Sequence, residues 1–272
     1  MAYKTILVSG GPEAWADDGV RTALDVARMF DAHVIGMAAE AFVPAVASDL
    51  AFVDAATVQV LRDQLDVDLD IAGKRFWSLA ASTANSASWE AEVEFPLRAV
   101  SRRARGADLI VLSRPPKRLD DTKACRAGDL VMEAGTPVLV APEGAGSLRT
   151  ERVVVGWKDT RETRRAVADA LPFLMRADTV YLVECAEEGV SADTGLDAVA
   201  KRLARHGVNV EVQREPPAVW PVAARLEDVA SRVGANLVVV GAFGHSRMRE
   251  WAFGGVTKDL IEASRTFILL SR

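Results

Sequence analysis

The chain has 272 residues, of which half are apolar and about a quarter are charged, a composition typical of a soluble globular protein. Its net charge of −5 argues against nucleic acid or an anionic membrane as a partner. No apolar run is long enough to cross a bilayer, the N-terminus lacks a signal-peptide pattern, and Cys125 and Cys185 lack metal-type spacing. We therefore expect a reduced, cytoplasmic protein of one large or two ordinary domains.

The first part of the chain alternates apolar runs typical of buried parallel strands with segments of helical periodicity. Strands are expected at 5–8, 33–37, 89–94, 108–112 and 137–140, and helices from about 20, 97 and 128. An additional segment, residues 42–84, includes an expected helix from Asp54 to Ala81. A lid, a partner surface and plain extra packing are all open for this segment.

The second part repeats this pattern, with strands expected at 152–155, 179–183, 209–212, 236–240 and 267–270. Asp159 is expected to cap the first helix of this round, with Glu162 at capping-box spacing. Alternating strands and helices imply parallel pairing with right-handed crossovers. The fold class is therefore α/β, with two tandem five-stranded, doubly wound domains at residues 1–143 and 151–272.

The clearest motif follows the strand at 236–240. Gly241 and Gly244 come directly after it, Gly254 and Gly255 follow, and a helical pattern starts at Val256. Glycine lets the backbone approach a ligand closely, and a helix N-terminus presents free N–H groups and a positive dipole end. This arrangement is typical of a phosphate site, and ligands of doubly wound sheets bind beyond the carboxyl ends of the strands.

The segment from Val240 to Val256 resembles the universal stress proteins, whose nucleotide-binding members carry Gly-x2-Gly-x9-Gly followed by Ser or Thr. The resemblance implies a tandem universal stress protein with Rossmann-like domains. It also implies that ATP or a related adenine nucleotide, with or without Mg²⁺, binds in the second domain. The implied site residues are Gly241, Gly244, His245, Gly254, Gly255, Val256, Trp157 and Lys158. His245 would contact a phosphate or cap the loop, and Trp157 would offer an aromatic face to the base.

Two departures from the family pattern concern this site. Gly255 replaces the Ser or Thr, which removes one neutral hydrogen bond of about 0.5–1.5 kcal/mol, roughly a two- to tenfold loss of affinity. Lys158 stands where the family has an acidic residue, with Asp159 one position later. We expect the change at Gly255 to weaken binding without abolishing it.

The first domain departs further from the pattern. Ser113-Arg114-Pro115-Pro116 replaces the first glycine pair, and Arg126-Ala127 replaces the second. Proline has no N–H for a phosphate, and side chains would crowd the loop. We therefore predict one nucleotide site, in the second domain, with the first domain as a structural or regulatory counterpart.

Three functions are compatible with the sequence. The first is a nucleotide-responsive stress protein that signals or scaffolds through an unknown protein partner. The second is a slow ATPase or phosphotransferase on the same site, and the third is a structural or interaction protein without a ligand. Scattered histidines, the absence of a Ser-His-Asp arrangement and the absence of metal-type clusters favour a protein that is not an enzyme.

The last strands of the two rounds suggest an internal assembly. Val138-Leu139-Val140 and Ile268-Leu269-Leu270 could pair antiparallel within one chain, which would cover two apolar edges that otherwise invite aggregation. The result would be an intramolecular pseudo-dimer, with a homodimer as a further option.

Overall fold

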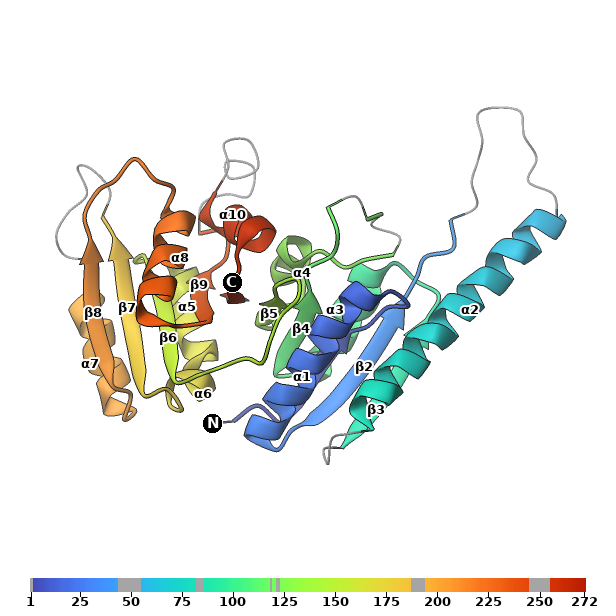
Figure 1. The fold of residues 1–272 in the computed structure, drawn as a ribbon, viewed down its shortest axis with the longest axis horizontal. Coiled ribbons are helices and arrows are strands. Elements are labelled where there is room, and N and C mark those ends of the chain that lie inside the picture. The colour runs from blue at the N-terminus through green and yellow to red at the C-terminus, as the bar shows by residue number, and fades with distance from the viewer. Residues whose placement is uncertain are drawn as a thin grey trace.

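In the computed structural model, residues 2–43, 55–81, 86–117, 119–120, 123–186, 194–244 and 255–272 are described. Their strands form one ten-stranded sheet in the order β3-β2-β1-β4-β5-β10-β9-β6-β7-β8 (Figure 1). Neighbours pair in parallel except β5 and β10, which are antiparallel. The strands are β1 Thr5–Ser9, β2 His33–Ala39, β3 Ala87–Glu92, β4 Leu109–Ser113, β5 Val138–Ala141, β6 Arg152–Trp157, β7 Thr179–Cys185, β8 Val210–Glu215, β9 Leu237–Gly241 and β10 Phe267–Ser271.

Helices cover both faces of this sheet. α1, α2, α5, α6 and α7 contribute to the core on one face, and α3, α4, α8 and α10 to the core on the other. The helices are α1 Asp17–Phe30, α2 Ala55–Ala80, α3 Pro96–Arg103, α4 Ala127–Glu133, α5 Arg161–Asp169, α6 Leu171–Leu174, α7 Leu196–Arg205, α8 Val222–Val233 and α10 Val256–Ala263, with short 3-10 turns at Ala14–Ala16 and Ala104–Gly106. The predicted doubly wound α/β architecture is confirmed.

The central strands are the purest apolar runs because helices cover them on both faces. β4, β5 and β10 are buried along their whole length, whereas apolar and polar residues alternate along the edge strands β3 and β8. The strand expected at 89–94 lies two residues earlier, at Ala87–Glu92. After Glu92 the chain turns into α3, and in this turn the Glu94 carboxylate accepts the Phe95 N–H at 2.8 Å.

The two halves join along β5 and β10, as the sequence predicted. The register places Leu139 opposite Leu269 and Val140 opposite Ile268, and these residues are buried. A second contact lies on the α1 face, where the rings of Tyr3 and Phe173 have centroids 5.2 Å apart. One hydrophobic cluster includes residues of both halves, so the sheet forms a pseudo-dimer with a shared core.

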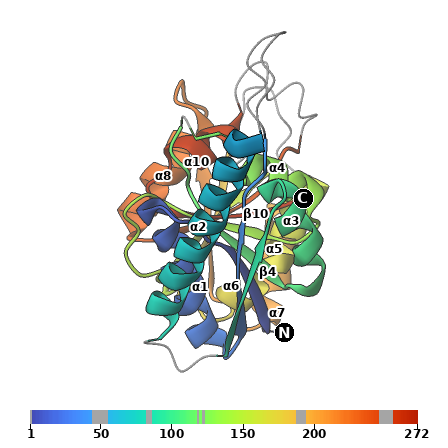
Figure 2. The same ribbon diagram turned by 90° about the vertical axis from the view of Figure 1, so that its right-hand side faces the viewer.

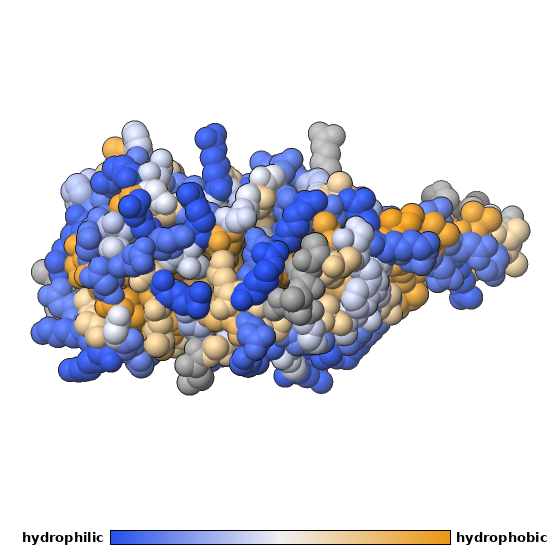
Figure 3. Space-filling view, turned by 60° about the horizontal axis from the view of Figure 1, so that its bottom comes forward, coloured by the Kyte–Doolittle hydropathy of each residue, from blue (hydrophilic) through white to orange (hydrophobic). Residues whose placement is uncertain are grey.

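α2 fills the additional segment of the first half and lies against β2 and β3 at the outer end of the sheet (Figures 1 and 2). Phe76 is buried beneath Trp89, with ring centroids 5.1 Å apart, so extra packing is one role of this segment. The opposite end of α2 projects from the body and exposes apolar side chains, among them Val60 at 66% (Figure 3). Among the helices described, none combines the length and apolarity needed to span a bilayer.

Candidate functional site

The candidate site lies at the carboxyl edge of the second half, where β6 and β9 end side by side. These strands pair in parallel, with Val155 opposite Val239. Their register places the turn from Lys158 to Thr160 next to the loop from Gly241 to Gly244. α5 starts at this edge with its N-terminus toward the loop.

The cap of α5 is Thr160, so the prediction of Asp159 is wrong by one residue. Thr160 has extended backbone angles, and its Oγ1 accepts the Thr163 N–H at 3.2 Å. The Asp159 carboxylate instead forms an ion pair with Arg164 at 2.8 Å. The capping box with Glu162 therefore does not form. The Glu162 side chain pairs with Arg161 instead.

Gly241 is a glycine because α5 crosses directly over the end of β9. A Cβ at this position would lie 2.4 Å from the Thr163 nitrogen and 2.6 Å from the Glu162 carbonyl carbon. Real Cβ contacts are never this short, so helix packing alone explains this glycine. Gly244 is different, because a Cβ there would lie at ordinary distances, 3.4 Å from Thr160 and 3.5 Å from Glu162 Oε2.

The protein itself uses part of the loop's hydrogen-bonding capacity. The Ala242 N–H donates to the Ser271 carbonyl at 2.8 Å, and the Phe243 N–H donates to Thr257 Oγ1 at 3.2 Å. Phe243 has a positive φ of 53°, which is uncommon for a residue with a side chain. Within the described part of the chain, no acceptor meets the N–H groups of Gly244 or Gly255.

Glu162 places a buried carboxylate beside this loop. Its side chain is 5% exposed and pairs with Arg161. Burial pushes the pKa of Glu162 upward, but hydrogen bonds from Arg161, from its own N–H and from Thr160 hold it below the ordinary value. The group is therefore ionised at neutral pH. Sequence reasoning missed it as a site residue, although an acid in the first turn of the helix beside a glycine loop was a usable signal.

The remaining predicted residues differ in their placement. Trp157 is 4% exposed within the hydrophobic core, and its indole N–H donates to the Thr194 carbonyl at 2.9 Å, so it does not offer an open ring to a base. Lys158 is exposed at the turn after β6. Gly255 caps α10 in an extended conformation, and half-buried Val256 follows it. His245 and Gly254 lie outside the described residues.

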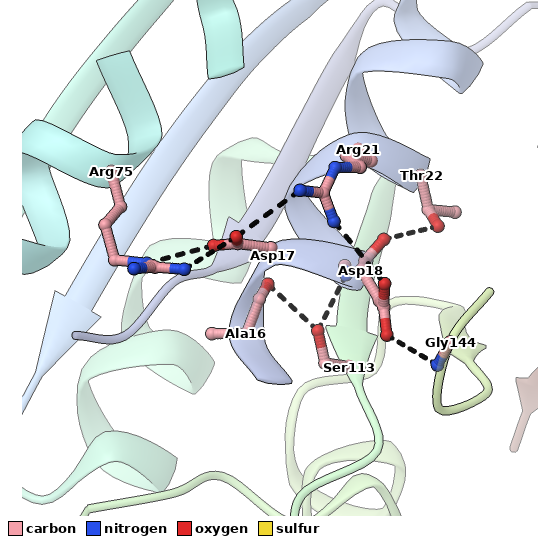
Figure 4. Close-up of polar contacts among 9 residues, drawn as sticks. Ala16, Asp17, Asp18, Arg21, Thr22, Arg75, Ser113 and Gly144 are labelled. Atoms are coloured by element: carbon pink, nitrogen blue, oxygen red, sulfur yellow. Dashed lines mark hydrogen bonds and ion pairs between the residues drawn. The ribbon is translucent and has the colours of Figure 1, made fainter. Parts of the chain in front are cut away.

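At the matching edge of the first half, the space between the end of β4 and the first turn of α1 is filled by the protein's own groups (Figure 4). Ser113 ends β4, accepts the Gly19 N–H at 2.7 Å and donates to the Ala16 carbonyl at 3.0 Å. Asp18 accepts the Gly144 N–H at 2.8 Å, and Asp17 accepts two hydrogen bonds from Arg75. The first turn of α1 is thus engaged by side chains and by the linker.

Neither a metal centre nor a reactive thiol stands out. No group of three His, Cys, Asp or Glu side chains is arranged to hold a metal ion in the part of the chain that the structure describes. Both cysteines are free; burial raises the pKa of Cys125 to about 12, and burial also raises the pKa of Cys185. This agrees with their interpretation as packing residues.

Two five-stranded units joined through their last strands define a tandem, doubly wound α/β protein. The chain is similar to a universal stress protein from Archaeoglobus fulgidus over 98% of its length and 96% of that chain, at 11% identity and a TM-score of 0.71. A putative universal stress protein from Pseudomonas aeruginosa matches over 99% and 93%, at 14% identity and 0.58. A functionally unknown protein from P. aeruginosa matches over 99% and 92%, at 14% identity and 0.56.

The chain therefore has the universal stress protein fold over both of its halves. At these low identities the likeness concerns the fold. No protein-family model and no curated protein matches the sequence.

Proposed function

We propose that this chain is a tandem universal stress protein of the cytoplasm that binds ATP or a related adenine nucleotide at the edge of its second half. It would act by conformational signalling rather than by turnover. The observation that carries the proposal is the contrast between the two edges. At the matching positions the first half has Pro116, which has no N–H, and the bulky Arg126, whereas the second half has Gly244, whose N–H meets no acceptor among the described residues.

Glu162 suggests how the nucleotide would be oriented. An ionised carboxylate repels phosphate but accepts hydrogen bonds from hydroxyl groups, and charge-assisted bonds of this kind are the stronger ones. The ribose would therefore lie toward Gly244 and Glu162. The phosphates would lie toward Gly255 and Val256, where the N-terminus of α10 favours negative charge.

Titration of the purified protein with a fluorescent ATP analogue tests the proposal. We expect one site per chain, in agreement with the closed first half. Gly244→Val should weaken binding at least tenfold with little loss of stability, because its Cβ fits beside Thr160 while its methyl groups would enter the ligand space. Gly146→Val is the matched control, because nothing lies within 4 Å of the Cβ position there. Two equivalent sites, or unchanged binding by Gly244→Val, would contradict the proposal.

The orientation has its own test. ATP should bind more tightly than 2′,3′-dideoxy-ATP, by roughly tenfold for hydrogen bonds to a charged group, and Glu162→Gln should reduce that preference. A preference that Glu162→Gln leaves unchanged would place the ribose elsewhere. Release of phosphate beyond one equivalent in the presence of Mg²⁺ would instead support the slow ATPase.

A further inference from the structure

A cavity of about 400 Å³ lies where the two halves meet, away from the edge between α5 and β9. The first half contributes the end of β4, the start of α4 and Val140 of β5. The second half contributes Phe243 and one side of α10. The positions that replace the family's glycines in the first half, Ser113 to Pro115 and Arg126 to Ala127, thus form a wall of this space.

The charged groups around the cavity are mainly cationic. Arg114, Lys117, Arg126 and Lys258 face two carboxylates, those of Asp129 and Glu262. Within the described part of the chain, Lys117 and Lys258 have no carboxylate at ion-pair distance. An excess of positive charge in a concave space attracts a negatively charged ligand.

Arg114 provides a second, independent observation. One of its terminal nitrogens, Nη2, donates to the Ser264 carbonyl at 2.6 Å, which fixes the guanidinium across the junction. Its Nε is buried without a hydrogen-bond partner. The enclosed Nε and the bond to Ser264 hold the guanidinium in place, and the carboxylates of Glu227 and Glu143 also act on it, so the cavity meets Arg114 through its remaining terminal nitrogen.

The remaining wall is apolar, and Phe243 is its most unusual component. Phe243 has a positive φ, its N–H donates to Thr257 Oγ1, and its ring lies across the junction beside Gly128 of α4. The ring edge lies 3.4 Å from the Cβ position of Gly128, and Ile261 lies 3.8 Å from the same point. The absence of a side chain at Gly128 thus leaves room beside the aromatic ring.

We propose that this junction cavity binds a small organic acid, with an apolar, flat body against Phe243 and Ile261 and its anionic group among Arg114, Lys117 and Lys258. Such a site uses both halves of one chain. It is distinct from the proposed nucleotide site and does not depend on it. The two sites share the segment from Gly241 to Gly244, because Phe243 lines the cavity while Gly244 faces α5.

The probe for the test is 1-anilinonaphthalene-8-sulfonate, which joins a flat apolar body to one anionic group. Fluorescence titration of the full chain at low salt should give a saturable site. Lys117→Met and Lys258→Met should each weaken binding roughly three- to tenfold, because each removes one charge near the anion. Lys201→Met, an exposed change on α7, is the control and should leave binding unchanged.

Two further measurements separate this site from general apolar binding. N-phenyl-1-naphthylamine, which lacks the sulfonate, should bind at least tenfold more weakly and should not respond to either lysine change. Gly128→Leu should block the probe by filling the space beside Phe243, with thermal unfolding measured to confirm the fold. Equal binding of the neutral compound, or wild-type affinity in the Lys117→Met/Lys258→Met double variant, would overturn the proposal.

Discussion

The two halves of the chain solve the same packing problem in opposite ways. In each half a strand ends beneath the first turn of a helix, and the crossing is too close for two side chains. The first half places the glycine on the helix, at Gly19, and a serine on the strand, at Ser113. The second half places the glycine on the strand, at Gly241, and a threonine on the helix, at Thr163.

Whether the glycine lies on the helix or on the strand determines which polar groups lie at each edge. With a serine on the strand, the hydroxyl reaches the helix and takes the Gly19 N–H, so the first half has a neutral internal cap. With a glycine on the strand, the second half caps its helix from Thr160 and holds the ionised Glu162 beside the loop. A glycine after a strand is therefore first a packing device, and its presence alone does not identify a ligand site.

The largest effect should come from breaking the seam that unites the halves. Leu139→Asp would bury an unpaired carboxylate where β5 meets β10, and we expect a loss of roughly 4 kcal/mol or more. Because one core serves both halves, amide exchange should accelerate in both. Val93→Asp, at an exposed position, should change stability by less than about 0.5 kcal/mol. Faster exchange confined to residues before the linker would show that the halves are independent.

The second largest loss of stability should come from substituting the glycines at the two helix–strand crossings, Gly241 and Gly19. Gly241→Ala places its Cβ against α5 backbone atoms, and we expect a loss of roughly 3 kcal/mol in urea unfolding. Gly19→Ala should cost less, because the nearest backbone atom to its Cβ, the Ser113 nitrogen, would lie at 2.7 Å rather than 2.4 Å. The Ser113 hydroxyl also lies at 2.7 Å, and the change Ser113→Gly removes that second contact. The pair Gly19→Ala/Ser113→Gly should therefore lose less stability than the sum of the single changes. Gly146→Ala should be neutral, and a Gly241→Ala protein of full stability would contradict the packing explanation.

Removing the capping hydroxyl of Ser113 or of Thr160 should cause smaller losses of stability, and the two losses should differ. Ser113→Ala leaves the buried Gly19 N–H and Ala16 carbonyl without their partner, for which we expect a loss of about 2 kcal/mol. Thr160→Ala removes a cap that water can replace, and we expect about 1 kcal/mol. Urea unfolding of both variants measures the difference. A larger loss of stability for Thr160→Ala than for Ser113→Ala would contradict the expectation that the buried cap of the first half contributes more.

Much of the fold could be predicted from the sequence because apolar runs and helical periodicity directly reflect burial. The parallel pairing within each half and the antiparallel pairing of β5 with β10 follow from alternating elements and from two apolar edges. The error at Asp159 arose because two adjacent residues can both cap a helix, and only the backbone angles of Thr160 decide between them.

Less of the candidate site than of the fold could be predicted from the sequence. The role of Gly241 depends on where α5 crosses β9, which is a tertiary contact that the strand sequence does not record. Trp157 looked available after a strand, but its ring is buried in the core and its indole N–H donates to the Thr194 carbonyl. The junction cavity could not be predicted at all, because its two walls belong to segments more than 100 residues apart.

The smallest effect concerns pH and the Glu162 carboxylate beside the glycine loop of the second half. Because the pKa of Glu162 is lower in the folded protein than its ordinary value of 4.5, its contribution to stability is present above that value. This contribution is lost as the pH falls through the folded pKa. Wild type should therefore exceed Glu162→Gln in stability at pH 7, and the difference should shrink below about pH 4.5.

Urea unfolding at pH 7, 5, 4 and 3 measures this difference. Glu211→Gln, which changes an exposed carboxylate on β8, is the control for the general effect of removing one acid. A difference that grows in acid would mean that burial dominates and raises the pKa of Glu162. The group would then be protonated more easily than an ordinary carboxyl, and it would be a weak choice for an acceptor of ribose hydroxyls.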